Sequence, residues 1–365
     1  MKRYALYMSL AISLFTSLGP KSYSQKVPEI KTFDAQGAGT ASGQGTVARS
    51  INITGEIIGE YYDSKVAVHG FLRISDDQII ALDVSGASTG NGQGTFPKSI
   101  NASGEIVGFY FDAAHLVTRG FIRDSGGVIS TFDNGLAVSI NSDGVVTGPW
   151  GPNHLGFVRE RNGNITTFNA GPFGTFPSSI NDRGEITGFY VDQSFTSHGF
   201  LREADGRIVP FNVGPNNLNQ TQPTDINAEG SIIGITSELT TGKTHGFVRS
   251  KEGHIKVFDV GPNGTYPAAI DSCGRITGYY FDKNKLAQGF ARRAHGRITT
   301  FEVPGAGGPF FGDGTLPQSN NQEGVITGYY TDSIGSYHGF LRLPDRSNSG
   351  NACEDDDKEA EEADN

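Results

Sequence analysis

The sequence predicts an all-β protein, a seven-bladed β-propeller made of four-stranded antiparallel blades. The first observation is a block that recurs seven times, with the pattern S-I-N-x-x-G-E-I-x-G-x-Y-x-D, then H-G-F-L-R, then I-x-x-F-D-V. The second is its spacing of 40 to 50 residues, which is typical of propeller blades when each repeat holds several short strands. The third is the composition, because 51 glycines and 36% hydrophobic residues suit a β-rich chain with many tight turns.

Each repeat is expected to contain four strands, A to D. In repeat two, strand A ends at Asn101, and strands B, C and D cover residues 105–110, 120–123 and 129–133. The A–B turn has the form N-x-x-G, in which the first side chain can hydrogen-bond the turn backbone. The first residue of this turn marks the seven repeats: Asn52, Asn101, Asn141, Asn181, Asn227, Asp271 and Asn321.

The ring is expected to close with a strand from the other end of the chain. Repeat seven stops after Leu343 and has no D strand of its own. Residues 30–34, with the D-strand sequence I-K-T-F-D, precede repeat one. An N-terminal strand that completes the last blade would remove an open sheet edge.

The chain divides into three expected parts. Residues 1–24 have the form of a secretion signal, with Lys2 and Arg3 before an apolar run and a small-residue cleavage site. Residues 25–343 should form the propeller, and residues 344–365 an acidic, disordered tail. We therefore expect a secreted protein, extracellular or periplasmic. The chain has no later apolar run of ~20 residues and no basic stripe, so neither a membrane span nor nucleic acid is expected.

The strand C motif carries a resemblance to a known family. Its H-G-F triplets begin at His69, His198, His245 and His338. In these triplets the chain resembles the HAF-repeat bacterial extracellular proteins, which are named for a His-Ala-Phe motif. The resemblance covers residues 30–343 and departs from the motif where glycine replaces alanine, and at Arg119, Leu155 and Gln288, which replace the histidine. It implies export and a repeat fold, and it implies no particular activity.

An arginine ends strand C in every repeat and suggests an anion-binding ring. Antiparallel pairing of strands B and C about their hairpin predicts instead that a glycine faces each arginine, as Gly59 faces Arg73. The missing side chain would leave room for the arginine to lie across the sheet. We favour this structural role. The arginines are Arg73, Arg123, Arg159, Arg202, Arg249, Arg292 and Arg342.

The same pairing places an acid opposite a base at the mouth of the B–C hairpin. Such a pair could be half of a catalytic dyad or of a metal site. Because the pair recurs in five repeats, we favour a cross-strand latch that closes each hairpin. The pairs are Asp63 with His69, Asp112 with Arg119, Asp192 with His198, Glu238 with His245, and Asp332 with His338.

Candidate ligand-binding residues are sought where the repeats differ. Arg49 and Lys98 occupy a strand A position that is small or neutral in the other repeats, and they would place basic groups near the mouth of the central channel. Asp225 adds an acid in repeat five. Repeat three has a shortened B–C hairpin, which predicts a notch on the rim. Its candidate lining residues are Trp150, Asn153 and His154.

Three functions remain open from the sequence. The first is a binding module for an extracellular ligand, such as an acidic glycan or a surface protein. The second is a polysaccharide lyase or hydrolase, and the third is a purely structural surface repeat. The usual nucleophile, zinc and calcium motifs are missing, so we lean away from catalysis and expect no cofactor and no metal. We expect a monomer, in which export would allow Cys273 and Cys353 to form a disulfide.

Overall fold

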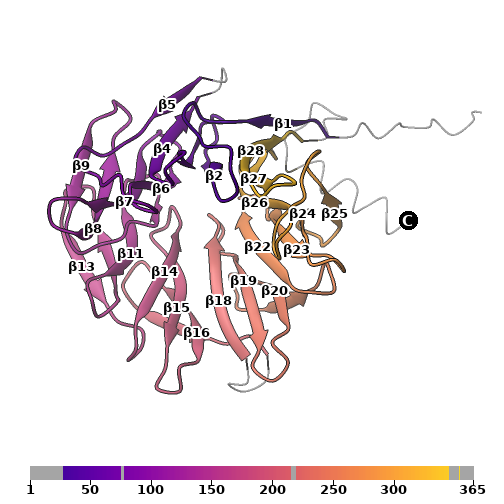
Figure 1. The fold of residues 1–365 in the computed structure, drawn as a ribbon. Helices are drawn as coiled ribbons and strands as arrows, with labels where there is room; N and C mark the ends of the chain where they lie inside the picture. The colour runs from indigo at the N-terminus through magenta and orange to yellow at the C-terminus, as the bar shows by residue number, and fades with distance from the viewer. Residues whose placement is uncertain (1–27, 75–77, 215–218, 345–352, 354–365) are drawn as a thin grey trace, which may run out of the picture.

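The computed structural model describes residues 28–74, 78–214, 219–344 and 353. The expected secretion signal lies outside the described residues, as does the expected tail except for residues 344 and 353. Every regular element of the described part is a β-strand. Figure 1 shows these strands arranged in small sheets around a common centre. The prediction of an all-β fold built from four-stranded antiparallel sheets is confirmed.

The strands follow the sequence repeats. The first strands, which lie innermost in Figure 1, are β2 (Gly45–Ile51), β6 (Thr95–Ile100), β10 (Ser139–Ile140), β14 (Thr175–Ile180), β18 (Asn219–Ile226), β22 (Thr265–Ile270) and β26 (Thr315–Asn320). The second strands are β3 (Ile57–Tyr62), β7 (Ile106–Asp112), β11 (Val146–Trp150), β15 (Ile186–Val191), β19 (Ile232–Glu238), β23 (Ile276–Phe281) and β27 (Ile326–Thr331).

The outer strands complete each sheet. The third strands are β4 (Val68–Arg73), β8 (Val117–Arg123), β12 (Leu155–Arg159), β16 (Ser197–Arg202), β20 (Thr244–Arg249), β24 (Ala287–Arg292) and β28 (Tyr337–Arg342). The fourth strands are β5 (Ile79–Ala81), β9 (Ile129–Phe132), β13 (Ile165–Phe168), β17 (Ile208–Phe211), β21 (Ile255–Phe258) and β25 (Ile298–Phe301). In repeat seven the fourth position is taken by β1 (Ile30–Phe33), which pairs antiparallel with β28.

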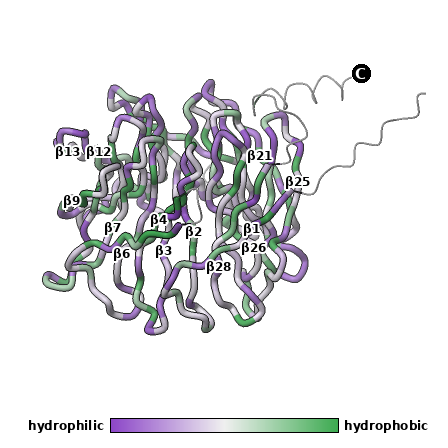
Figure 2. Tube along the Cα trace, turned by 90° about the horizontal axis from the view of Figure 1, so that it is seen from above, coloured by the Kyte–Doolittle hydropathy of each residue, from purple (hydrophilic) through white to green (hydrophobic). Residues whose placement is uncertain are grey.

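Repeats two to six each form a separate four-stranded sheet. Repeats seven and one share an eight-stranded sheet, because a single parallel bridge joins Gly45 of β2 to Tyr337 of β28. Each first strand contacts the first strand of the next repeat, and β26 contacts β2. The strands alternate in direction, so the turns gather at two opposite ends of the molecule, as the perpendicular view in Figure 2 shows. We call the end with the A–B turns the base and the end with the B–C hairpins the rim.

The core of each repeat contains one third-strand phenylalanine with no exposed surface, packed among buried aliphatic side chains. In six repeats this ring meets, edge to face, the aromatic ring that ends the fourth strand of the preceding repeat, as Phe33 and Phe71 do at a centroid distance of 6.1 Å. Such contacts add about 1 kcal/mol to the burial of the rings. Phe121 instead shares its cluster with Leu82. The core residues are Phe71, Phe121, Phe157, Phe200, Phe247, Phe290 and Phe340.

At the base, the asparagines of the A–B turns join neighbouring repeats. Within its own turn, Asn101 Oδ1 accepts a hydrogen bond from the backbone N–H of Glu105 at 2.9 Å, as the turn motif predicts. Its amide also donates to the backbone oxygen of Asn141 in the next repeat, at 3.0 Å. The last glycine of the turn needs a left-handed backbone, with φ of 80° at Gly104.

The expected pairing of glycine with arginine is wrong by two residues. Arg73 faces Ile57, and Gly59 faces Phe71. The hairpin turn is centred one residue earlier than expected, on residue 65, where the Asp63 N–H donates to the Ala67 oxygen. A side chain at Gly59 would meet the Val47 oxygen at 2.1 Å and the Phe71 ring at 2.9 Å. The glycine therefore makes room for the core phenylalanine.

The strand C arginines instead lie over the core of the preceding sheet. Arg202 lies 5.1 Å from the centroid of Phe168, and its Nη1 donates to the Glu203 oxygen. Arg342 lies over Phe301 in the same way, at 4.9 Å. This cation–π contact explains why the arginine recurs with the fourth-strand aromatic residue.

Candidate functional site

The acid and base residues of the B–C hairpins meet in the five repeats where the sequence predicts them. Because of the shifted register they are diagonal neighbours. The residue directly opposite His69 is Tyr61, whose ring stacks on the imidazole at 4.9 Å. The closest distances are 3.7 Å for Asp63–His69, 3.0 Å for Asp112–Arg119, 2.9 Å for Asp192–His198, 3.4 Å for Glu238–His245 and 3.5 Å for Asp332–His338.

Sequence reasoning missed a second partner on the other side of each base. His69 Nδ1 lies 2.8 Å from Asp83, two residues after the end of the fourth strand β5. The signal was present, because the aspartate of the I-x-x-F-D-V segment recurs with the histidine. The corresponding contacts are Arg119–Asp133 at 3.2 Å, His198–Asn212 at 2.7 Å, His245–Asp259 at 2.7 Å and His338–Asp34 at 3.0 Å.

These hairpin acids have pKa values below their usual range. The hydrogen bond from His198 lowers the pKa of Asp192, with help from the backbone N–H of Thr196. The Asp63 carboxylate likewise accepts backbone N–H groups from the hairpin turn, at 2.8 and 2.9 Å. Among the described residues, no group of three or more His, Cys, Asp and Glu side chains is arranged to hold a metal ion. The geometry is that of a structural contact between hairpin and sheet edge.

The inner strands carry a second set of polar residues, around Arg49. Its Nε donates to Glu60 Oε1 at 2.8 Å, and its guanidinium lies 5.8 Å from the Tyr329 ring centroid. Although burial opposes it, the Glu60 carboxylate raises the pKa of Arg49. Sequence reasoning missed Glu60, which replaces an aromatic residue found at the equivalent position of repeats two and four. Arg49 is therefore already paired within the protein.

Lys98 has a different environment. Its Nζ lies 5.7 and 5.1 Å from the ring centroids of Phe96 and Phe109, which stack on each other. Burial lowers the pKa of Lys98, and so does the Arg49 guanidinium, while Glu60 opposes this effect. Within the described residues, no carboxylate lies within 4 Å of the amine. Lys98 is thus the unpaired cation of the inner strands.

Three stacked aromatic pairs line the inner strands, each made by directly opposed residues of a first and a second strand. Phe96 and Phe109 in repeat two have their centroids 5.0 Å apart. Repeat four has a second phenylalanine pair and repeat six a tyrosine pair, and all six rings are half-buried. The other two pairs are Phe176–Phe189 at 4.9 Å and Tyr266–Tyr279 at 5.0 Å.

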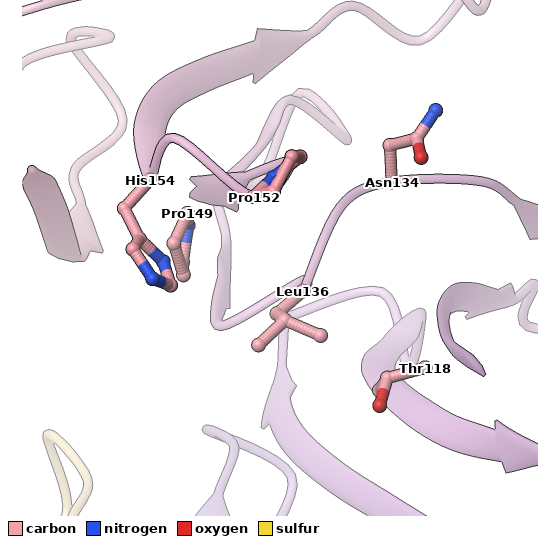
Figure 3. Close-up of a pocket in the computed structure, with 7 residues that line it drawn as sticks. Thr118, Asn134, Leu136, Pro149, Pro152 and His154 are labelled. Atoms are coloured by element: carbon pink, nitrogen blue, oxygen red, sulfur yellow. The ribbon is translucent and has the colours of Figure 1, made fainter. Parts of the chain in front are cut away.

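Repeat three lacks such a pair, and a hollow of about 220 Å³ opens there. Figure 3 shows Leu136 and Pro149, which stand at the aromatic positions, together with the exposed His154. The imidazole lies 5.3 Å from the Phe176 ring of the next repeat. The remaining lining residues are Thr118, Asn134, Gly151 and Pro152.

The other residues expected at this notch do not line the hollow. Trp150 is half-buried and packs on the core ring of Phe157 at 5.4 Å, so it fills the position of a packing tyrosine. Asn153 is exposed in the adjacent hairpin.

Asp225 is part of the contact between sheets. It accepts hydrogen bonds from the Ser179 hydroxyl at 2.7 Å, from the backbone N–H of Ile226 and from that of Ile270, both at 2.9 Å. Ser179 belongs to repeat four and Ile270 to repeat six, so the carboxylate links three repeats. Burial raises the pKa of Asp225 to about 6. Most other repeats have a serine at this position.

Cys273 and Cys353 form a disulfide, with Cα atoms 5.3 Å apart. Cys273 lies in the A–B turn of repeat six, so the bond attaches the chain beyond repeat seven to the base.

The fold is that of known β-propellers. The chain is similar to a streptogramin B lyase (11% identity, TM-score 0.57), with 87% of this chain and 98% of that one covered. It is also similar to a virginiamycin B lyase from Staphylococcus aureus (11% identity, TM-score 0.54), with 87% of this chain and 100% of that one covered. A third similar structure is a Pyrococcus horikoshii acylaminoacyl peptidase (9% identity, TM-score 0.55), with 82% of this chain and 52% of that one covered. At these identities the likeness shows the fold alone. No protein family and no curated protein matches the chain.

Proposed function

We propose that the chain is an exported, seven-bladed β-propeller that binds an acidic glycan at the centre of the ring. Seven blades are supported by the seven sequence repeats and by the contact between β26 and β2. Export is supported by the form of residues 1–24 and by the resemblance to HAF-repeat extracellular proteins. Among the described residues, no helix is long and apolar enough to span a membrane.

The observation that carries the proposal is the unpaired amine of Lys98 on the rings of Phe96 and Phe109. A half-buried cation without a carboxylate partner favours an anionic ligand. The flat apolar faces beside it suit the C–H face of a sugar ring, since aromatic residues combine large contact area with few rotatable bonds. A uronic acid residue would present both groups together. The ligand would enter near the hollow of repeat three, one of the repeats without a stacked aromatic pair.

Binding to an oligosaccharide array tests this proposal. Wild-type protein should bind uronic acid oligosaccharides, with an affinity that falls as salt is added. Lys98→Ser, which copies the serine of repeat four at Ser178, should lose about tenfold or more in affinity. Lys243→Ser, at an exposed hairpin of the rim, is the matched control and should bind normally. Binding of acidic oligosaccharides that is equal in both variants would contradict the proposal.

The catalytic alternative is tested in the same mixtures. Glu60 and Arg49 are the ionisable groups whose charges act on Lys98, so a lyase would act there. It would release products with an unsaturated sugar, which absorb ultraviolet light. Bound oligosaccharide that is recovered intact supports the binding function. An ultraviolet absorbance that grows with time for the wild-type protein, and does not grow for Lys98→Ser, would show that the protein is a lyase and would contradict a purely binding function.

A further inference from the structure

The tyrosine pair of repeat six differs from the other inner pairs only in its hydroxyl groups. Tyr266 and Tyr279 stack at 5.0 Å with an interplanar angle of 9°. Phe96 and Phe109 stack at the same distance, with an angle of 22°. The chain therefore packs this position equally well with phenylalanine, and packing does not explain the two hydroxyl groups.

Packing within the protein does not use these hydroxyl groups for hydrogen bonds either. No hydrogen bond joins Tyr266 or Tyr279 to another side chain of the described residues, and neither oxygen belongs to the fully buried atoms that lack a partner. Burial raises the pKa of Tyr279 to about 12. Its hydroxyl is thus protonated at neutral pH and available as a donor.

Further tyrosines continue this surface into repeats seven and one. Tyr329 lies under the Arg49 guanidinium, and its centroid is 5.7 Å from that of Tyr337. Tyr337 in turn lies 6.0 Å from Tyr62. The pKa of Tyr279 is also raised by Tyr329, which links repeats six and seven. We call these five residues the tyrosine sector: Tyr62, Tyr266, Tyr279, Tyr329 and Tyr337, all of them half-buried.

An acceptor without a partner lies beside this sector. Glu60 Oε1 binds Arg49, but Glu60 Oε2 is buried and has no hydrogen-bond partner among the described residues. Glu60 also raises the pKa values of Tyr62 and Tyr329, after the effect of burial, so its charge is close to both rings. A buried carboxylate oxygen left without a donor is costly, and a ligand hydroxyl would satisfy it.

We infer that the tyrosine sector and Glu60 form a subsite for neutral, hydroxyl-rich sugar residues. The inference rests on the proposed function, because it places the neutral part of the same ligand. Sugar rings would stack on the tyrosine faces, tyrosine hydroxyls would donate to ring oxygens, and one sugar hydroxyl would donate to Glu60 Oε2. The carboxylate of a neighbouring uronic acid in the same oligosaccharide would lie towards Lys98. The charge of Lys98 interacts with both Glu60 and Arg49. The ligand class is an oligosaccharide in which uronic acid and neutral residues are adjacent.

The test uses a variant whose residues already occur at the equivalent positions of another repeat. The double change Tyr266→Phe and Tyr279→Phe converts the pair of repeat six into the pair of repeat two, so folding should be retained. Tyr190→Phe, which removes a hydroxyl from a rim tyrosine outside the sector, is the matched control. The probes are an array of immobilised oligosaccharides, half of them neutral and half containing uronic acid. Lys98→Ser is measured in parallel.

The outcomes separate the subsite from the proposed function. We expect the double variant to lose about tenfold in affinity for mixed acidic and neutral oligosaccharides, equivalent to two hydrogen bonds, while Tyr190→Phe is unchanged. If the double variant binds within twofold of wild type, the subsite is overturned and the function stands. If only neutral oligosaccharides bind and Lys98→Ser has no effect, the subsite stands and the acidic ligand is overturned. Absence of all binding overturns both.

Discussion

The side-chain amide of Asn321 donates to the backbone oxygen of Asn52 at 3.0 Å, although 269 residues separate them. This contact repeats the geometry by which Asn101 donates to Asn141 in neighbouring repeats. The last repeat is thus held to the first by the same bond that joins each consecutive pair from repeat one to repeat six. At the outer edge of repeat seven, β1 supplies the strand that this repeat lacks.

If β1 serves as an ordinary fourth strand, its aromatic residue should matter as much as any other. Phe33→Ala and Phe301→Ala each remove one ring from an edge-to-face contact with a core phenylalanine. We expect each to reduce the free energy of unfolding by about 3 kcal/mol. Chemical denaturation measures both. A silent Phe33→Ala beside a destabilising Phe301→Ala would exclude closure by β1.

Substitution of Arg49 should lower the free energy of unfolding much more than substitution of Lys98. Arg49→Ser leaves the Glu60 carboxylate buried without its partner, and such a loss costs about 3–5 kcal/mol. Lys98→Ser breaks no ion pair and loses only its cation–π contacts, so it should change stability by about 1 kcal/mol or less. Adding Glu60→Gln to Arg49→Ser should recover part of the loss, because the unpaired charge is removed. Equal melting temperatures for the two single variants would disprove the buried pair.

Asp225 predicts a stability change between pH 4 and pH 6. Its pKa is about 6 in the folded protein and about 3.9 when unfolded, so the folded state binds the proton more tightly. Stability should therefore fall as pH rises through this window, by up to about 3 kcal/mol, and stay constant above it. Asp225→Ser, which copies Ser179, should flatten this part of the profile. Parallel profiles for wild type and variant would count against the raised pKa.

The contact between His198 and Asp192 predicts a change in the opposite direction. The pKa of Asp192 is lowered chiefly by His198, so its contribution is present above about pH 3.9 and is lost as pH falls through the lower folded value. His198→Gln, which copies Gln288, should move the Asp192 pKa back towards its usual range, as measured by NMR titration. His154→Gln, at a histidine of the hollow, should leave it unchanged. An Asp192 pKa that is insensitive to His198→Gln would refute the contact.

The disulfide predicts that the folded protein has no reactive thiol. The bond between Cys273 and Cys353 spans 80 residues that include repeat seven. Chain entropy suggests a stabilisation of up to about 4 kcal/mol, so Cys353→Ser should lower the melting temperature. A thiol-reactive reagent under denaturing, non-reducing conditions provides the check. Two labelled cysteines would contradict the bond.

Much of the fold follows from the repeated pattern, because seven copies of one block average out local ambiguity. Strand positions, the N-x-x-G turns and the extra strand at residues 30–34 are all visible in it. The register of strands B and C is not visible in the pattern, because it depends on where the Asp63 hairpin turn is centred. A change of one residue in the turn centre moves every pair by two. The glycine opposite Phe71 was therefore assigned to the wrong partner.

The candidate site was harder to predict, because it depends on neighbours from different repeats. The sequence marks Arg49 and Lys98 as unusual but cannot show that Glu60 pairs with one of them and not the other. It marks Trp150 as unique, whereas the structure uses it for packing. The tyrosine pair of repeat six becomes notable only when its geometry is compared with the phenylalanine pairs.

Repeat three has implications for redesign. Its first strand is only two residues long, yet Asn101 still donates to the Asn141 oxygen and Asn141 to the Asn181 oxygen. The contacts at the base are thus kept where the rim above them is shortened. A hairpin transplanted from one repeat to another should likewise leave the asparagine contacts at the base in place. Hairpin length can accordingly vary between repeats, in evolution or by design, while the arrangement of the sheets is unchanged.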